Sequence, residues 1–491
     1  MHRLVRFTAV SGLSFLANMI LLIARAKILA FLLGPYGVGV VAQLNNFITL
    51  LCTLVSTGIG YGVTNVIASH FDEASEDYAD EVASAAALLI IITAVITGGA
   101  IAISQPLSAL LLGSEDNKRI VLITAVGLPF SYFSFFAESV LQGRKAIPEI
   151  ARARVVSSFA GLVVIIPLGW YFGVMGAAWG ISLSSLISFW VYALYSRQYF
   201  CWSRLWPQKH FSIHKIGTIL QFGFAMSLIK SANALAVLLV RTQIVRSLGL
   251  SANGIYQVIW AISSQFLALV PLSLWAYAYP HLTQLATYEE KEQINLELER
   301  VLNLGILALI PMIYVIMVAR NLVVRLLYTA EFLPATEIMM FQLWGDFFRF
   351  IIWWAELPLY AKGKVLFIVA VEVVGNLLYV LMGIFLLSTY GLMGVCMAYT
   401  IASGLAAVMA LVFVYKHLHI CPTSANMSIL LKGSLLLIVA SFTPQDFTVK
   451  TILVFAFILA LWTVWALNDR ERVKILRFVQ EILSSGKIIS H

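Results

Sequence analysis

Long apolar stretches follow one another along almost the whole chain and are separated by short polar connections. A helix needs about 20 apolar residues to cross the hydrocarbon core of a bilayer. Fourteen stretches are candidates: residues 7–33, 39–68, 83–104, 120–142, 153–170, 174–196, 216–247, 254–282, 301–319, 335–360, 365–387, 392–415, 428–443 and 450–467. Because irregular backbone exposed to lipid is not tolerated in the bilayer core, the pattern predicts an all-α, polytopic membrane helical bundle.

Several markers recur in the same order in the second part of the chain, 215 to 218 residues later. They are Arg25, Gly34 and Gly39, which recur as Arg241, Gly249 and Gly254; Ala137-Glu138, which recurs as Ala355-Glu356; and Gly173 and Gly176, which recur as Gly391 and Gly394. The shared order and offset predict two related halves of six helices each. In membrane transporters, such repeats usually place the transport path between the halves.

The repeat and the polar connections together predict the domain organisation. We expect an N-terminal lobe at 1–200, an inter-lobe cytoplasmic linker at 201–215 and a C-terminal lobe at 216–418. Two extra transmembrane helices at 419–467 have no repeat partner. The basic tail at 468–491 carries apolar residues at helical spacing and is expected to lie on the membrane surface.

The composition agrees with a membrane protein and excludes several other classes. Of the 491 residues, 61% are hydrophobic and 11% are charged, whereas about a quarter of the residues in a soluble domain are charged. The net charge of +8 is scattered along the chain, so it does not predict nucleic-acid binding. The four cysteines form no CxxC pair, and no metal site, cofactor or disulfide is expected. No Walker A, HExxH or GxSxG motif stands in a fitting context, so we expect a transporter driven by gradients and not an enzyme.

Lysine and arginine in the connections predict the topology. If the N-terminus is cytoplasmic, 20 of these residues fall on the cytoplasmic side and 6 on the other. Positive residues favour the cytoplasmic side. Both termini are therefore expected in the cytoplasm.

Charged residues inside the predicted spans are the main candidates for function. A charge facing lipid at the bilayer centre costs roughly 2.5 to 3.5 kcal/mol on insertion scales, so these residues must face protein or a water-filled cavity. They are Arg25, Lys27, Glu138, Lys230, Arg241, Asp346, Arg349, Glu356 and Glu372.

Helical spacing predicts a cavity with a cationic lining. Asn18 and Arg25 are seven residues apart and share a stripe of the first span, while Lys230 and Arg241 lie on nearly the same face of the seventh. The second span adds Asn46 at the start of a polar stripe, and Lys27 lies on a different face from Arg25. Such a cavity suits an anion, most naturally a phosphate. The alternative is that the cations pair with acidic side chains and only hold the bundle together.

Glu138 and Glu356 form a repeat pair just inside the cytoplasmic ends of their spans. A buried carboxylate can exchange a proton, hold Na⁺, or close a gate by pairing with a cation. The alternative is an ion pair with neighbouring bases at the helix end. Asp346 and Arg349 are three residues apart and are candidates for gating or ion coupling, or for satisfying each other.

Four segments resemble those of a known family. Residues 33–39 read Leu-Gly-Pro-Tyr-Gly-Val-Gly and resemble the first-loop signature of bacterial polysaccharide flippases. Residues 57–64, 341–346 and 360–362 are similar to the end of that family's second helix, to its tenth span and to the exit of that span. The resemblance covers about residues 5–416 and is greatest to the O-antigen and enterobacterial-common-antigen translocases of the multidrug/oligosaccharidyl-lipid/polysaccharide exporter superfamily. The last two spans depart from the usual twelve of that group, whereas lipid II flippases of the same superfamily have fourteen.

The resemblance implies a function. The family moves an undecaprenyl-diphosphate-linked oligosaccharide from the cytoplasmic to the periplasmic leaflet of the bacterial inner membrane by alternating access. Its cationic central cavity carries over to Arg25, and to Arg241 through the repeat. Expected partners are that substrate, membrane lipids, a polysaccharide polymerase and a chain-length regulator, and the protein is expected to be a monomer. Coupling to H⁺, coupling to Na⁺ and uncoupled movement are all open at this point.

Three alternatives follow from the same sequence. A lipid II-type flippase belongs to the same superfamily. A cation-coupled drug or toxin exporter is disfavoured because the repeated deep charge is arginine. A membrane glycosyltransferase or polymerase is disfavoured because it needs a large loop for its catalytic groups, and no connection is longer than about 20 residues.

Overall fold

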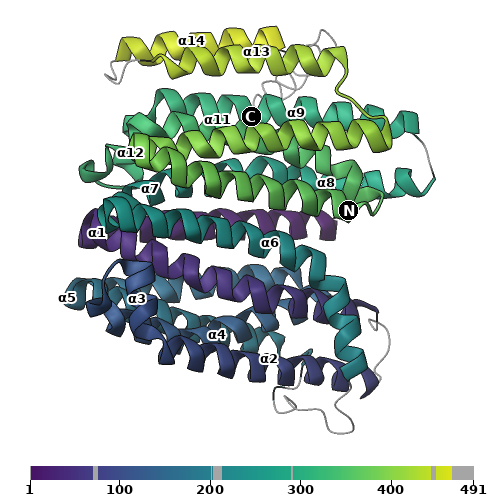
Figure 1. Cartoon of the computed structure of the whole chain (residues 1–491). Coiled ribbons are helices and arrows are strands. Elements are labelled where there is room, and N and C mark those ends of the chain that lie inside the picture. Colours follow the sequence, from purple (N-terminus) through teal and green to yellow (C-terminus); the bar gives the residue numbers. More distant parts are fainter. Residues whose placement is uncertain are drawn as a thin grey trace, which may run out of the picture. The chain divides into compact units, whose positions relative to one another are not determined.

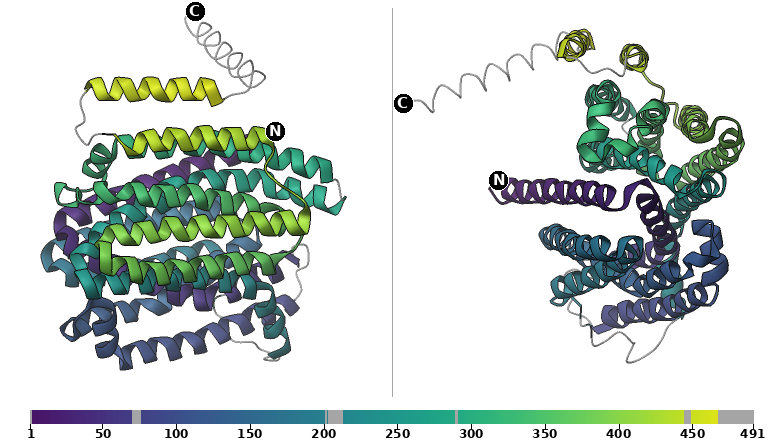
Figure 2. Two further views of the ribbon diagram at one scale, coloured as in Figure 1. Left: turned by 45° about the horizontal axis from the view of Figure 1, so that its top comes forward. Right: turned by 90° about the vertical axis from the view of Figure 1, so that its left-hand side faces the viewer.

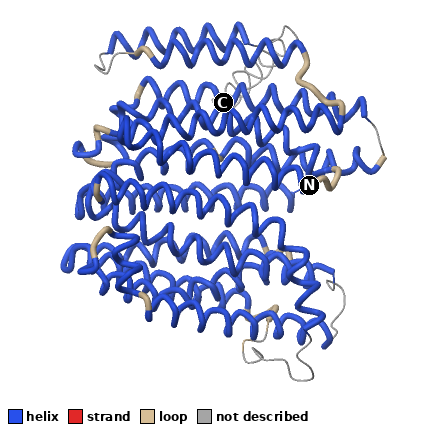
Figure 3. Tube along the Cα trace, viewed as in Figure 1, coloured by secondary structure: helices blue, strands red, loops and turns tan. Residues whose placement is uncertain are grey.

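Helices make up nearly all of the protein that the computed structural model describes, namely residues 2–69, 76–200, 202, 213–288, 291–443 and 449–466. No strand occurs within these ranges, as Figure 3 shows. Nine helices in this part of the chain are long and apolar enough to cross a membrane. The prediction of an all-α, multi-pass membrane protein is confirmed.

The long helices overlap the predicted apolar stretches, most of them to within seven residues at each end, while the helix that begins at Lys291 starts ten residues before the predicted span at 301–319. In chain order they are α1 His2–Ser69, α2 Glu76–Ala102, α3 Ser104–Leu112, α4 Lys118–Gly143, α5 Ile147–Ser196, α6 Ile213–Leu248, α7 Leu250–Ile262, α8 Leu269–Thr287, α9 Lys291–Val318, α10 Arg320–Leu327, α11 Ala335–Ala361, α12 Val365–Leu418, α13 Ser424–Ser441 and α14 Val449–Ala466 (Figure 1). Most of the predicted linker at 201–215 and the tail at 468–491 lie outside the described residues.

Three of the long helices each join two predicted spans across a kink at a glycine. The kinks lie at Gly34 in α1, Gly173 in α5 and Gly391 in α12, where φ is 61°, 57° and 60°. Only glycine adopts this backbone conformation without a steric penalty. The sequence therefore fixes a change of direction at these points, and Figure 2 shows it for α1.

Three short elements were not predicted, and the first of them is α3. A π-helical turn, Ser263–Leu267, separates α7 from α8 inside the stretch predicted as one span at 254–282. The amphipathic helix α10 follows α9 directly. A π-turn inserts one extra residue per turn and often marks a functional position.

The chain divides into two compact units. Unit 1 contains Met1–Trp260, Val324–Ile338 and Val365–Ala402, and unit 2 contains Ala261–Val323, Met339–Lys364 and Ser403–His491. The predicted lobe boundaries and the two six-helix repeats stay a prediction.

The core of unit 1 is built where α1, α4 and α5 pack side by side (Figure 1). Leu44 and Val63 of α1, Leu128 and Tyr132 of α4, and Ile165 of α5 are almost fully buried in one apolar cluster. This packing brings the polar faces of the same three helices to a common cavity.

Unit 2 is held together around α9. The indole nitrogen of Trp354 in α11 donates to the carbonyl of Leu298 at 2.8 Å, and Asn426 of α13 donates to Asn303 at 2.9 Å. Thr423 and Asn426 form a capping box that starts α13. The first of the two extra helices is thereby fixed to α9.

Candidate functional site

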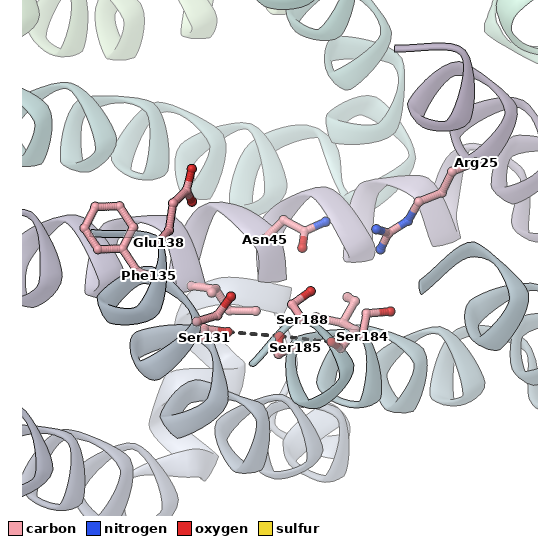
Figure 4. Close-up of a pocket in the computed structure, with 11 residues that line it drawn as sticks. Arg25, Asn45, Ser131, Phe135, Glu138, Ser184, Ser185 and Ser188 are labelled. Carbon is pink, nitrogen blue, oxygen red and sulfur yellow. Dashed lines mark hydrogen bonds between the residues drawn. The ribbon is translucent and has the colours of Figure 1, made fainter. Parts of the chain in front are cut away.

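A polar cavity of about 300 Å³ lies inside unit 1, among α1, α4 and α5 (Figure 4). Its lining is mostly polar: Arg25, Asn45, Ile48, Ser131, Ser134, Phe135, Glu138, Ile181, Ser184, Ser185 and Ser188. The bend at Gly34 explains how α1 contributes twice, with Arg25 before it and Asn45 after it. The residues from α4 and α5 follow helical spacing, so each helix presents one polar stripe.

Arg25 is the cation of this cavity. Its side chain is partly buried, and no hydrogen bond or ion pair joins it to another residue in the described part of the chain. Figure 4 shows the guanidinium group pointing from α1 toward Asn45. A guanidinium group in a membrane interior needs a partner, and phosphate oxygens match its donors in geometry and charge.

The serine wall consists of Ser131, Ser134, Ser184, Ser185 and Ser188. Ser131 donates to the hydroxyl of Ser185 at 2.9 Å, which links α4 to α5 across the cavity floor. Ser185 donates to the carbonyl of Ile181 at 3.1 Å, and Ser184 to that of Gly180 at 2.5 Å. These hydroxyl protons are thus directed to protein acceptors.

Glu138 lies on the opposite side of Asn45 from Arg25 (Figure 4). Its Oε1 accepts a hydrogen bond from Nη2 of Arg154 on α5 at 2.8 Å, which makes an ion pair. An ion pair with neighbouring bases at the helix end was the alternative role for Glu138, and the nearest bases along the chain are Arg144 and Lys145. Arg154 is sixteen residues away and reaches Glu138 because α4 and α5 are antiparallel neighbours.

Arg241 does not line this cavity. It is fully buried in unit 1, where Nη2 donates to Gln257 at 2.7 Å and Nη1 to Asn253 at 3.3 Å. The guanidinium carbon lies 5.1 Å from the ring centre of Tyr256 and 5.9 Å from that of Trp260. Two amides and two aromatic faces surround this cation, while its Nε has no hydrogen-bond partner among the described residues. Its predicted contact with a substrate stays a prediction.

The other predicted cavity residues of unit 1 are also engaged elsewhere. Lys27 donates to the carbonyls of Arg325 and Leu326, at 3.2 and 2.7 Å, at the end of α10. Lys230 donates to the hydroxyl of Tyr61 at 3.0 Å.

The two asparagines that were predicted to line the cavity, Asn18 and Asn46, do not line it. Asn18 accepts a hydrogen bond from Ser158 at 2.6 Å, which fastens the first part of α1 to α5. Asn46 is next to the cavity-lining Asn45 but does not itself line the cavity.

Three predicted gating residues belong to unit 2. Asp346 is buried and accepts a hydrogen bond at 2.6 Å from Ser263, the first residue of the π-helical turn. Glu356 is buried and Arg349 is partly buried in α11. Their roles in gating or ion coupling stay predictions.

Sequence reasoning missed the serine wall. A signal was present, because Ser131, Ser134 and Glu138 recur at the spacing of one helix face, as do Ser184 and Ser188. Single serines are common in membrane helices, however, and only the packing of α4 against α5 shows that these two stripes face each other.

Comparison with known proteins assigns this chain to a family. The model of the polysaccharide biosynthesis protein family matches residues 28–337. This range begins just after Arg25 and includes the kink at Gly34 and the other residues that line the cavity. The chain belongs to this family.

Relatives and solved structures extend the comparison. The lipid III flippases of Escherichia coli (strain K12) and Shigella flexneri are each 24% identical over 376 residues, covering 76% of this chain and 89% of the relative. The structure of the lipid II flippase MurJ in an inward closed conformation has a TM-score of 0.74 at 15% identity, covering 94% of this chain and 98% of that one. An inward-facing multidrug transporter of the MATE family has a TM-score of 0.67 at 18% identity, covering 85% and 95%. This member of the polysaccharide biosynthesis protein family therefore has the fold of MOP superfamily transporters.

Proposed function

We propose that the protein is a flippase for undecaprenyl-diphosphate-linked oligosaccharide, of the O-antigen or a related repeat unit. It carries this substrate from the cytoplasmic to the periplasmic leaflet by alternating access. The observation that carries the proposal is Arg25, a cation without a protein partner among the described residues, in a polar cavity of a membrane protein. The lipid III and lipid II flippases among its relatives and fold neighbours support it.

Arg25 would bind the diphosphate, and the serine wall gives the sugars polar contacts inside the bilayer. The long polyprenyl tail can stay in the lipid. Since phosphate oxygens only accept hydrogen bonds and guanidinium only donates them, the match is specific.

A drug exporter is the second candidate, supported by the fold likeness to a multidrug transporter. A cationic drug would be repelled by Arg25 and attracted by Glu138. The ion pair of Glu138 with Arg154 weakens that attraction and favours the lipid-linked anion.

The proposal includes the cellular setting. We place the protein in the bacterial inner membrane with both termini cytoplasmic, acting beside a polymerase and a chain-length regulator. Glu138, Glu356, Asp346 and Arg349 are proposed to gate the path or couple it to H⁺ or Na⁺. Glu138→Gln and Glu356→Gln variants whose transport keeps the pH and Na⁺ dependence of the wild type would exclude these two carboxylates from coupling.

The experiment that tests the function uses the native host with its own copy of the gene deleted. Arg25→Ala is expected to abolish surface polysaccharide. Arg25→Lys should retain part of it, because the lysine ammonium keeps the positive charge but cannot donate two parallel hydrogen bonds to phosphate as a guanidinium does. Arg246→Ala is the matched control, because Arg246 is exposed at the end of α6 and outside the cavity. Wild-type polysaccharide from Arg25→Ala, at equal protein levels in the membrane, would refute the proposal.

A further inference from the structure

The cavity of unit 1 has two chemically different ends. Arg25 supplies only hydrogen-bond donors, whereas Glu138 supplies only acceptors while it is paired with Arg154. Figure 4 shows Asn45, whose amide can do both, between them. A ligand that fills the whole cavity must therefore carry acceptors at one end and donors at the other.

The serine wall adds to the acceptor end. A hydroxyl has one donor proton and two acceptor lone pairs. Ser184 and Ser185 donate to backbone carbonyls one turn back, and Ser131 donates to Ser185 and, at 3.3 Å, to the carbonyl of Gly127. One lone pair of Ser185 accepts from Ser131, and the other lone pairs of these three oxygens can accept hydrogen bonds from a ligand in the cavity.

We propose that the serine wall and Glu138 form a sugar subsite that selects neutral sugars rich in O–H and N–H donors and disfavours sugars that carry a carboxylate. The subsite rests on the proposed function, because the diphosphate at Arg25 fixes which end of the substrate meets the wall. The carboxylate of a uronic acid only accepts hydrogen bonds, and here it would meet the acceptor Oε2 of Glu138 and three hydroxyls whose protons are directed to protein acceptors, those of Ser131, Ser184 and Ser185. Removing a hydrogen-bond partner from a buried group is costly, and a site of this kind discriminates by leaving groups unpaired.

Arg154 is a positioning residue for this subsite. It does not line the cavity, and it holds Oε1 of Glu138, which leaves Oε2 for the ligand. Its side chain is about half exposed, whereas that of Glu138 is mostly buried, so replacing Arg154 would leave the Glu138 carboxylate without its counter-charge.

The test measures dissociation constants of the purified full chain in detergent for three synthetic probes. They are undecaprenyl diphosphate, the same lipid carrying N-acetylglucosamine, and the same lipid carrying glucuronic acid. The variants are Ser131→Ala/Ser185→Ala, Glu138→Gln and Arg25→Ala. Ser196→Ala is the control, since this serine lies on α5 but bonds to Trp202 outside the cavity.

The proposal predicts that wild type binds the N-acetylglucosamine probe more tightly than the bare lipid, and the glucuronic acid probe about tenfold more weakly than the N-acetylglucosamine probe. The double serine variant should bind the N-acetylglucosamine probe about five- to tenfold more weakly than wild type does, as expected for the loss of two hydrogen bonds. It should keep its affinity for undecaprenyl diphosphate, which also reports correct folding. Glu138→Gln should bind the glucuronic acid probe more tightly than wild type does, and Ser196→Ala should match wild type.

Two outcomes would overturn the inference, and they differ. If undecaprenyl diphosphate binds in an Arg25-dependent way but the serine and Glu138 variants keep wild-type sugar preferences, the subsite is wrong and the proposed function stands. If the bare lipid does not bind, or binds equally well to Arg25→Ala, the proposed function fails and the subsite fails with it.

Discussion

Arg25 and Arg241 are the same residue type in the same unit, but their surroundings give them different chemistry. Arg25 reaches a polar cavity and has no protein partner among the described residues. Arg241 is enclosed by two amides and two aromatic rings. One of these amides, that of Asn253, also donates a hydrogen bond to the carbonyl of Gly39 at 2.8 Å. The two terminal nitrogens of Arg241 bond to protein groups inside unit 1, whereas those of Arg25 are open to a ligand in the cavity.

Replacing Arg241 with alanine is therefore expected to destabilise the protein. The change leaves Gln257 and Asn253 without their donor and opens a cavity among Tyr256 and Trp260, which together should cost about 2 to 4 kcal/mol. The thermal unfolding midpoint of the purified protein should fall clearly, whereas Arg246→Ala should not change it. An Arg241→Ala protein as stable as wild type would show that these contacts contribute little.

Residue positions were predicted only in part, for a geometric reason. The sequence shows that Arg25 lies nine residues before Gly34, and the structure places it on the polar cavity. The rotation of a helix is harder, because the kink at Gly34 breaks the register between the two parts of α1. Asn45 lines the cavity where Asn46 was predicted. Asn18 lies in the same part of α1 as Arg25 but bonds to Ser158, because helical spacing does not show which neighbouring helix a polar side chain meets.

At the scale of elements, a close crossing between α1 and α7 organises unit 1. A side chain at Gly39 would overlap the carbonyl oxygen of Leu250, and one at Gly254 would overlap that of Pro35. Gln43 of α1 donates to Thr242 of α6 at 2.9 Å beside this crossing. Small residues let helix backbones approach in a membrane, where packing and hydrogen bonds replace the hydrophobic effect.

The Gly39→Ala substitution should disrupt this crossing. An added methyl group has no room against a backbone carbonyl, so we expect a loss of about 1 to 3 kcal/mol in stability, with less protein in the membrane. Gly98→Ala in α2 is the matched control, because nothing lies near a side chain at that position. Equal stability of the two variants would mean that the crossing is looser than described.

The long helices could be predicted from the sequence, whereas the short ones could not. A span of about 20 apolar residues has no alternative in lipid except a helix. The π-helical turn at Ser263–Leu267 depends on one extra residue per turn, which hydropathy does not detect. The short helices α3 and α10 are below the length at which helical periodicity is distinctive.

At the scale of the whole molecule, α4 and the first part of α5 form a hairpin long enough to define membrane topology. From Ile147 to the kink at Gly173, the helix rises about 39 Å, more than the hydrocarbon thickness of about 30 Å. Trp170, Tyr171 and Phe172 are exposed at the far end, as aromatic residues at a membrane interface are. The turn at Arg144 and these aromatic residues therefore belong to opposite membrane surfaces.

Cysteine labelling can assign these surfaces. In a background whose four cysteines are replaced by alanine, Gln142→Cys and Tyr171→Cys would be exposed to a membrane-impermeant maleimide. The predicted topology places Gln142 in the cytoplasm, so intact cells should label only Tyr171→Cys, and opened cells should label both. The reverse pattern would invert the topology and place both termini outside the cytoplasm.

The central claim is that Arg25 makes the cavity a carrier for a lipid-linked diphosphate. The most direct measurement is the rate at which the full chain, reconstituted in proteoliposomes, moves undecaprenyl-diphosphate-linked N-acetylglucosamine between leaflets. We predict rapid movement by the wild type and by Arg246→Ala, and a loss of at least tenfold in Arg25→Ala. Movement by Arg25→Ala at the wild-type rate would contradict the account.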